Sequence, residues 1–169
     1  MATKGNTSVS KGIPVIKDAF VVIIKTEWNS TIVNKLEYGA KKLLKKQGIS
    51  YKTWVVPGAV EIPFAVKTYT ESEQPAADAF IAFGAVIRGG TPHFDFVCKL
   101  VTEGILSLNL MLQVPVIFGV LTLDNEAQAF ERTGGIHGHK GEEAAITAIK
   151  MISLNRKLNS APKAVRNSL

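Results

Sequence analysis

The hydrophobic pattern of the chain alternates between short apolar runs and longer segments of helical character. Four apolar runs predict strands at Phe20–Lys25, Tyr51–Val56, Ala79–Phe83 and Val116–Leu121. The segments between and after them predict helices over residues 30–47, 62–72, 92–113, 125–132 and 141–156. Gly48 is expected to close the first helix, because glycine readily adopts the backbone conformation that ends a helix.

Short, nearly continuous apolar strands separated by helices are typical of a parallel sheet covered on both faces. The pattern therefore predicts an α/β fold, a three-layer α/β/α sandwich of flavodoxin-like type with a four-stranded parallel sheet. The 169 residues suit one domain, 1–169, whose polar ends at about 1–12 and 159–169 are expected to be mobile. In such sheets ligands bind beyond the carboxyl ends of the strands.

Composition narrows the class of protein. With 46% hydrophobic and 20% charged residues the chain resembles an ordinary soluble protein, and no apolar run approaches the roughly 18 residues of a membrane helix. No secretory signal pattern opens the sequence, so a cytoplasmic location is expected. The net charge of +6 comes without a nucleic-acid-binding module, so nucleic acid is not an expected partner.

The single Cys98 lies in an apolar run and is expected to be a small buried hydrophobe.

The segment GAVIRGGTPHFDF contains the most specific local signal. Gly89 and Gly90 permit close backbone approach, Thr91 is expected to cap the next helix, and Pro92 suits its first position. This predicts a helix N-terminus with free N–H groups, which is an arrangement that binds phosphate. The alternative to a phosphate site is that these residues only form the turn between a strand and a helix. Arg88 either steers the phosphate or only braces the loop.

His93 follows in the first turn of the predicted helix. The helix dipole should disfavour the imidazolium there, leaving a neutral ring that can accept a proton. The alternative is an ordinary surface or core histidine.

Further candidates stand where the other strands end. Trp28 could stack on a flat ring or pack internally, and Glu61, after the exposed backbone of residues 58–60, could bind polar groups or only start a helix. Arg132 and Lys140 precede the last helix and either supply a second source of charge for phosphate or lie on solvated surface. His137 and His139 flank Gly138, but no carboxylate or cysteine at ligand spacing completes a metal site, so no metal is expected.

The second half of the helix VCKLVTEGILSLNLMLQ is apolar nearly all round. Such a helix needs cover on more than one side, as a central core helix or at a subunit interface.

Taken in order, several segments resemble lumazine synthase, the penultimate enzyme of riboflavin biosynthesis. They are Trp28-Asn29, PGAVEIP, GAVIRGGTPHFDFVC, VPVIFGVLT, QAFERTG and GHKGEEAA, and the likeness covers about Phe20–Leu158. The resemblance implies a transferase that joins 5-amino-6-(D-ribitylamino)uracil to 3,4-dihydroxy-2-butanone 4-phosphate. The products are 6,7-dimethyl-8-ribityllumazine, phosphate and water, and no metal or organic cofactor is required.

The resemblance also implies a role for each matching residue. Trp28 would stack on the pyrimidine, Ala59–Glu61 would hold the ribityl chain, and the backbone of Ala85–Ile87 would border the uracil edge. The full set of residues that it assigns to substrate binding is Trp28, Asn29, Ala59, Val60, Glu61, Ala85, Val86, Ile87, Gly90, Thr91, Phe118, Arg132 and Lys140.

For the phosphate, the resemblance implies binding by Gly90 and Thr91, aided by Arg132 and Lys140. Phe118 would come from the neighbouring subunit, and His93 matches the proton-transfer residue of the family. The chain departs from the family pattern at three positions: His139 replaces the usual Asn, Val60 replaces an aromatic residue, and Trp28 replaces the Phe of many bacterial members.

Lumazine synthases form pentamers with active sites between neighbours, and some assemble twelve pentamers into an icosahedral shell. The short link from Arg132 to Lys140 favours the shell, and riboflavin synthase is a possible protein partner by the same resemblance. Pro14 near the N-terminal edge could oppose a strand exchange between neighbours. Two other functions stay open: a noncatalytic flavin- or phosphate-binding shell protein, and an archaeal-type riboflavin synthase that consumes lumazine.

Overall fold

The computed structural model describes residues 11–160, and its centre is a four-stranded, all-parallel sheet of order β2-β1-β3-β4. The strands are β1 (Phe20–Thr26), β2 (Ser50–Val56), β3 (Ala79–Ile87) and β4 (Val116–Leu123). The helices are α1 (Ser30–Lys46), α2 (Ile62–Thr70), α3 (His93–Met111), α4 (Ala127–Arg132) and α5 (Lys140–Ser160), with a 3-10 turn η1 at Ala59–Glu61. The predicted four-stranded parallel sheet is confirmed.

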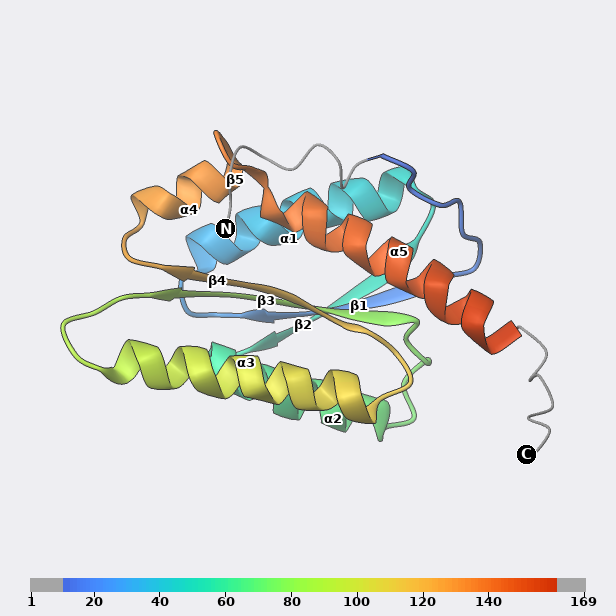
Figure 1. Cartoon of the computed structure of the whole chain (residues 1–169), viewed down its shortest axis with the longest axis horizontal. Coiled ribbons are helices and arrows are strands. Elements are labelled where there is room, and N and C mark those ends of the chain that lie inside the picture. The colour runs from blue at the N-terminus through green and yellow to red at the C-terminus, as the bar shows by residue number, and fades with distance from the viewer. Residues whose placement is uncertain (1–10, 161–169) are drawn as a thin grey trace, which may run out of the picture.

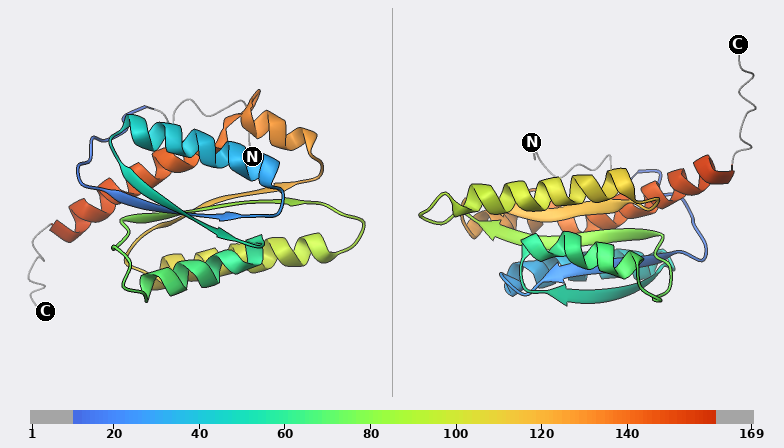
Figure 2. Two further views of the ribbon diagram at one scale, coloured as in Figure 1. Left: turned by 180° about the vertical axis from the view of Figure 1, so that it is seen from behind. Right: turned by 90° about the horizontal axis from the view of Figure 1, so that it is seen from below.

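Helices cover both faces of the sheet. Helices α1, α4 and α5 lie on one face, and α2 and α3 lie together on the other (Figures 1 and 2). Successive side chains of a strand point to opposite faces, so Val21 and Ile23 join the core under α1 and α5, while Val22 and Ile24 join the core over α2 and α3. Each such buried side chain contributes roughly 1.5–3 kcal/mol, which explains why β1 and β3 carry apolar residues at successive positions, over Val21–Ile24 and Ala79–Phe83. The three-layer sandwich is confirmed.

Strand β2 departs from that pattern because it lies at an edge of the sheet. Trp54 and Val55 are exposed in the single chain, although the run reads as apolar. The apolar run therefore predicts the strand correctly, but it does not predict that both faces of the strand are buried within one chain.

Strand β3 is longer than the sequence pattern predicts. It continues from Phe83 through Gly84 to Ile87, and this extension pairs with β4 in register, from Gly84 opposite Val120 to Ile87 opposite Leu123. The glycine does not end the strand, because its partner strand continues beside it. The prediction of an end at Phe83 was wrong, and Ala85–Ile87 belong to the strand.

The start of α3 also differs from the prediction. The helix begins at His93, Pro92 occupies the cap position, and no side chain makes a capping hydrogen bond. The prediction that Thr91 caps this helix was wrong. The Asp95 N–H donates to the Pro92 carbonyl at 3.0 Å, but no side-chain oxygen occupies the end of the helix, so the N–H groups of His93 and Phe94 stay available to a ligand.

Glycines set the other turns of the chain. Gly48 has φ 70° after α1, which confirms its predicted role. The link from α4 to α5 contains a small hairpin, β5 (Thr133–Gly135) and β6 (Gly138–His139), in which Gly134 and Gly138 have φ 121° and 74°. The expected mobile ends lie almost wholly outside the described residues, so that expectation stays a prediction.

Two further features bear on the class of protein. Among residues 11–160, no helix is long and apolar enough to cross a membrane. Cys98 is half-buried on α3, where burial and the nearby charge of Asp95 raise the pKa of its thiol. A raised pKa lowers the thiolate fraction, which argues against a nucleophile.

Candidate active site

A cavity of about 490 Å³, here called the first cavity, lies beyond the carboxyl ends of β1, β2 and β3 and beside the start of α3. In the sheet, β1 is flanked by β2 on one side and β3 on the other, so the connections from successive strands run to opposite sides of β1 at this point. Ligands of open parallel sheets bind at such switch points. The predicted site residues that line the first cavity are Trp28, Asn29, Ala59, Val60, Glu61, Ala85, Val86, Ile87, Thr91 and His93.

Trp28 stands at a loop that the backbone holds firmly. The hydroxyl of Thr26 donates to the Trp28 carbonyl at 3.0 Å, and the Trp28 N–H donates to the Pro57 carbonyl at 3.2 Å. The side chain itself is 69% exposed, so the alternative of an internally packed tryptophan is excluded. A fixed loop with an open indole suits stacking on a flat ring.

Asn29 both lines the first cavity and braces it. Its backbone has φ 57°, a left-handed conformation that asparagine tolerates better than most residues. Its side-chain Nδ2 donates to the Ala85 carbonyl at 2.7 Å, which ties the β1–α1 loop to β3. The predicted ligand-binding residue therefore has at least a structural contact inside the chain.

Gly58 lies close to the side chains of both Glu61 and Trp28. A Cβ atom at position 58 would lie 2.9 Å from Glu61 Oε2 and 3.5 Å from Trp28 Cε3. The missing side chain thus leaves room for both the carboxylate and the indole to pack over this backbone position, at the first turn after β2. Sequence reasoning noted the exposed backbone here but not this close packing.

The segment Gly89–Thr91 forms the rim of the first cavity next to α3. Gly89 and Thr91 line it and Gly90 lies between them, and a Cβ atom at either glycine would meet nothing within 4 Å. The two glycines therefore leave the backbone open to a ligand instead of relieving a crowded contact. His93 is exposed at the first position of α3, facing this rim.

Sequence reasoning missed the helical wall of the first cavity. Phe96, Val97 and Leu100 line it together with His93. The spacing 93, 96, 97 and 100 marks one face of a helix, and this signal could have found them.

Phe118 and Lys140 lie elsewhere, in a second cavity of about 500 Å³ between the edge strand β4 and α5. The two cavities have no lining residue in common among the described residues. Phe118 is 43% exposed at the sheet edge, and Lys140 Nζ contacts Glu143 at 2.9 and 2.7 Å to the two carboxylate oxygens.

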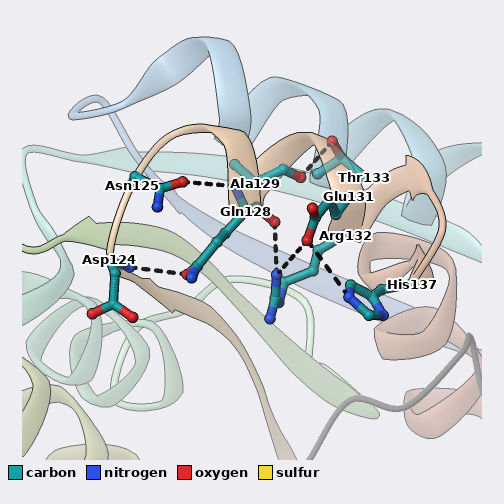
Figure 3. Close-up of polar contacts among 8 residues, drawn as sticks. All are labelled: Asp124, Asn125, Gln128, Ala129, Glu131, Arg132, Thr133 and His137. Atoms are coloured by element: carbon teal, nitrogen blue, oxygen red, sulfur yellow. Dashed lines mark hydrogen bonds and ion pairs between the residues drawn. The ribbon is translucent and has the colours of Figure 1, made fainter.

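Arg132 lines neither cavity within one chain. Its Nη1 donates to the Gln128 carbonyl at 2.9 Å and lies 3.6 Å from Glu131 Oε2, so the guanidinium is oriented by its own helix (Figure 3). The structure therefore brings the ring-binding, ribityl-binding and proton-transfer candidates together. It separates them from Phe118, Arg132 and Lys140.

The two histidines of the hairpin lie in different surroundings. In the part of the chain that the structure describes, no three side chains of His, Cys, Asp or Glu gather in a metal-binding arrangement. His137 Nε2 lies 3.5 Å from Glu131 Oε2, and the His139 ring packs against Gly39 of α1. Burial, together with the charge of Lys42, lowers the pKa of His139.

The fold and the residues around the first cavity are those of an α/β enzyme that acts on small molecules. Residues 18–156 match the sequence model of the 6,7-dimethyl-8-ribityllumazine synthase family. Proteins with that name from Parabacteroides distasonis and Porphyromonas gingivalis are 44% and 47% identical to the chain, over 85% and 86% of its length and 90% and 91% of theirs. A third, from Cytophaga hutchinsonii, is 44% identical over 90% of this chain and 96% of its own.

The chain therefore belongs to the 6,7-dimethyl-8-ribityllumazine synthase family. This membership confirms the family expected from the motifs and the expectation of an enzyme, a transferase of riboflavin biosynthesis.

Proposed function

We propose that this protein is a lumazine synthase that condenses ribitylaminouracil with 3,4-dihydroxy-2-butanone 4-phosphate, releasing phosphate and water. The observation that carries the proposal is the first cavity. One indole, one carboxylate, three strand-end peptide groups and a histidine meet there at the switch point of the sheet.

The uracil substrate would occupy the part of the first cavity between β1, η1 and β3. Trp28 stacks on the pyrimidine, and Glu61 accepts hydrogen bonds from ribityl hydroxyls beside the backbone of Ala59 and Val60. The peptide groups of Ala85–Ile87 border the uracil edge. The open indole of Trp28 and the Glu61 carboxylate packed beside Gly58 support this placement.

The phosphate would bind at the rim next to α3. Helix α3 has 19 residues, and its first N–H groups have no side-chain cap. The dipole of a long helix and its free N–H groups both favour a dianion there, so Gly90 and Thr91 are the proposed backbone donors. His93 stands at the first position of the same helix, close to the carbon atoms that precede the phosphate.

The reaction needs one site for both substrates and a group that moves protons. The 5-amino group attacks the ketone and water leaves, giving an imine; removal of a proton beside the imine lets phosphate depart with its bonding electrons. Tautomerisation of the enol and attack by the ribityl-bearing nitrogen then close the ring, with loss of the second water. We assign the proton removal and return to His93. Positioning of the two reactants contributes roughly 7–11 kcal/mol at most in such reactions.

A second copy of the chain would complete the site. Phe118, Arg132 and Lys140 lie away from the first cavity on their own chain, so Phe118 can close the ring pocket, and the two cations can reach the phosphate, only in a neighbour's site. The exposed apolar side chains of α3 support such packing; they are Phe96, Leu100, Leu106, Leu110 and Met111. Helix α3 is expected from the sequence to be either a central core helix or part of a subunit interface. The interface gains support, since only one side of the helix is buried in the core of its own chain.

Pentamers are the proposed assembly, and a shell of twelve pentamers is the larger form that the short hairpin link favours. Light scattering distinguishes the two by mass. A cytoplasmic location and riboflavin synthase as a partner stay predictions.

The test is to incubate the purified protein with both substrates and to follow lumazine fluorescence and phosphate release together. One phosphate for each lumazine is the expected result. Binding of the uracil substrate without product would instead indicate a noncatalytic shell protein. Consumption of added lumazine would indicate a riboflavin synthase.

A further inference from the structure

Arg88 directly follows β3 and makes contacts on several sides. Its Nε donates to Asp124 Oδ1 at 3.1 Å, and its Nη1 donates to Asp95 Oδ1 at 3.3 Å. Its guanidinium carbon lies 4.1 Å from the centroid of the Phe94 ring. The Arg88 N–H donates to the Leu123 carbonyl at 2.8 Å, which extends the pairing of β3 with β4 by one residue. Arg88 thus contacts two carboxylates, a ring and the neighbouring strand.

These partners belong to the elements around the proposed phosphate site. Phe94 and Asp95 directly follow His93 in the first turn of α3, and Phe94 lines the first cavity. Asp124 is the first residue after β4, where the chain turns toward α4. The β3–α3 loop and the β4–α4 connection lie at the same end of the sheet (Figure 1). The side chain of Arg88 therefore bridges the two connections.

Asp124 is itself anchored on the far side. Its N–H donates to Gln128 Oε1 at 3.0 Å, and the Gln128 N–H donates to Asn125 Oδ1 at 3.2 Å (Figure 3). The Gln128 carbonyl in turn accepts from Arg132 Nη1. A continuous series of contacts thus joins Arg88 to Arg132.

The loop needs such a brace because its own sequence gives it little support. Gly89 and Gly90 have no neighbouring atoms at their Cβ positions. Glycine loses more backbone entropy on ordering than any other residue, so this segment depends on its two ends for a fixed conformation. Arg88 holds one end, and α3 holds the other.

We propose that Arg88 is a positioning residue, which through Asp95 and Asp124 fixes residues 89–93 relative to α4 and does not bind the substrate phosphate itself. The guanidinium is already paired with two carboxylates, and both of them would repel an approaching dianion. The inference rests on the proposed function, because it concerns the segment that binds phosphate there. Exposed ion pairs contribute little to folding, so the effect is expected in the catalytic constants.

Asp124→Asn separates positioning from direct binding. The substitution keeps the size of the side chain and leaves the charge of Arg88 in place. If Arg88 positions the loop, kcat/KM for the butanone phosphate falls by about tenfold, since small misplacements of reacting groups are costly, and KM for ribitylaminouracil stays within about twofold. If Arg88 binds the phosphate, Asp124→Asn frees the guanidinium and leaves kcat/KM unchanged or higher, which would overturn the proposal.

Arg88 variants provide an independent readout. Arg88→Lys keeps the charge but lacks the planar fork that reaches two carboxylates, so it should lose as much activity as Arg88→Gln. Full activity of Arg88→Lys would contradict the proposal. In the double variant Arg88→Gln/Asp124→Asn, the two losses should not multiply, because both substitutions remove the Arg88–Asp124 ion pair.

Matched controls make the result specific. Glu71→Gln removes an exposed ion pair with Lys67 on α2, whose atoms are 3.4 Å apart, and should leave kcat and both KM values unchanged. Thermal unfolding of every variant should match that of the unaltered protein. A protein that makes no lumazine at all would refute the proposed function, whereas an active protein whose Asp124→Asn variant behaves normally would refute only the role of Arg88.

Discussion

The two groups of proposed site residues differ in how their own chain holds them. In the first cavity the side chains of Trp28 and His93 are exposed, and no described residue forms a hydrogen bond or ion pair with them. Arg132 and Lys140, by contrast, are held in place by Gln128 and Glu143 at hydrogen-bond distance. One group is left open for a ligand, and the other is oriented in advance by its own helix.

This contrast fits a site that two copies share. A side chain that must reach a neighbour's site benefits from being held in a fixed direction, because less rotamer entropy is then lost on binding. Lys140 would exchange Glu143 for the phosphate, or contact both, and the charge of the lysine stays compensated either way. The first cavity instead forms its shape from backbone contacts at the strand ends.

Arg132→Ala should have the largest effect on activity, because it removes the charge that the first cavity does not supply. We expect kcat/KM to fall by roughly 10²- to 10³-fold, the typical cost of losing one donor to a developing anion. Steady-state kinetics with lumazine fluorescence measure this. Lys67→Ala, which removes an exposed lysine of α2, is the matched control and should leave kcat/KM unchanged. An Arg132→Ala variant with normal kinetics would show that neither Arg132 nor α4 contributes to the site.

His93→Ala should have the next largest effect. Turnover should fall by about 10²-fold without being abolished, because a general base typically contributes that much and the positioning of both substrates is retained. The measurement is kcat at saturating substrates, with the assembly checked by light scattering. Complete inactivity of a folded and correctly assembled variant would mean that His93 does more than transfer protons.

Gly58→Ala tests the first cavity alone. The new methyl group would lie 2.9 Å from Glu61 Oε2, and the flexible carboxylate should move away to avoid it. We expect KM for ribitylaminouracil to rise by about tenfold, as for one lost hydrogen bond to a charged group, with kcat nearly unchanged. A fall in kcat of about tenfold with an unchanged KM would indicate that Glu61 acts in the reaction and not in binding.

The smallest effect is expected from His139, beside the second group. Burial, together with the charge of Lys42, lowers the pKa of this imidazole below its ordinary 6.5, although the charge of Glu142 opposes the shift. The unfolded chain therefore takes up a proton first as the pH falls below about 6.5, and the folded protein loses stability from there down to the lowered pKa. His139→Asn should abolish this loss in thermal unfolding scans at pH 7 and pH 5. An unchanged pH dependence would show that another group is responsible.

Much of the fold could be predicted from the apolar pattern, because buried strands form continuous apolar runs and glycines often follow the ends of helices. Gly48 is an example, since its position alone indicates the end of α1. The end of β3 could not be predicted, because Gly84–Ile87 stay extended only through pairing with β4. The hairpin at Thr133–His139 is too short for any periodic signal, and it depends on glycines with positive φ.

The candidate site shows the same limit. Residues next to strand ends, such as Trp28 and Glu61, could be located from the sequence because a parallel sheet brings those ends together. Thr91 could not be excluded as a cap, since capping depends on the conformation of the preceding loop. The division between the first cavity and Arg132 depends on how distant elements pack, and no local pattern records that.

A complementation experiment tests the shared site most directly. His93→Ala lowers turnover at the first cavity about 10²-fold and leaves Arg132 intact, while Arg132→Ala removes the guanidinium and leaves the first cavity intact. Co-expressed in equal amounts, the two variants should form mixed rings in which about a quarter of the interfaces combine two unaltered halves, because a closed ring requires head-to-tail interfaces. The account predicts that the mixture recovers about that fraction of the normal activity, far above either variant alone. A mixture no more active than the average of the two variants, in rings shown by mass spectrometry to contain both, would contradict it.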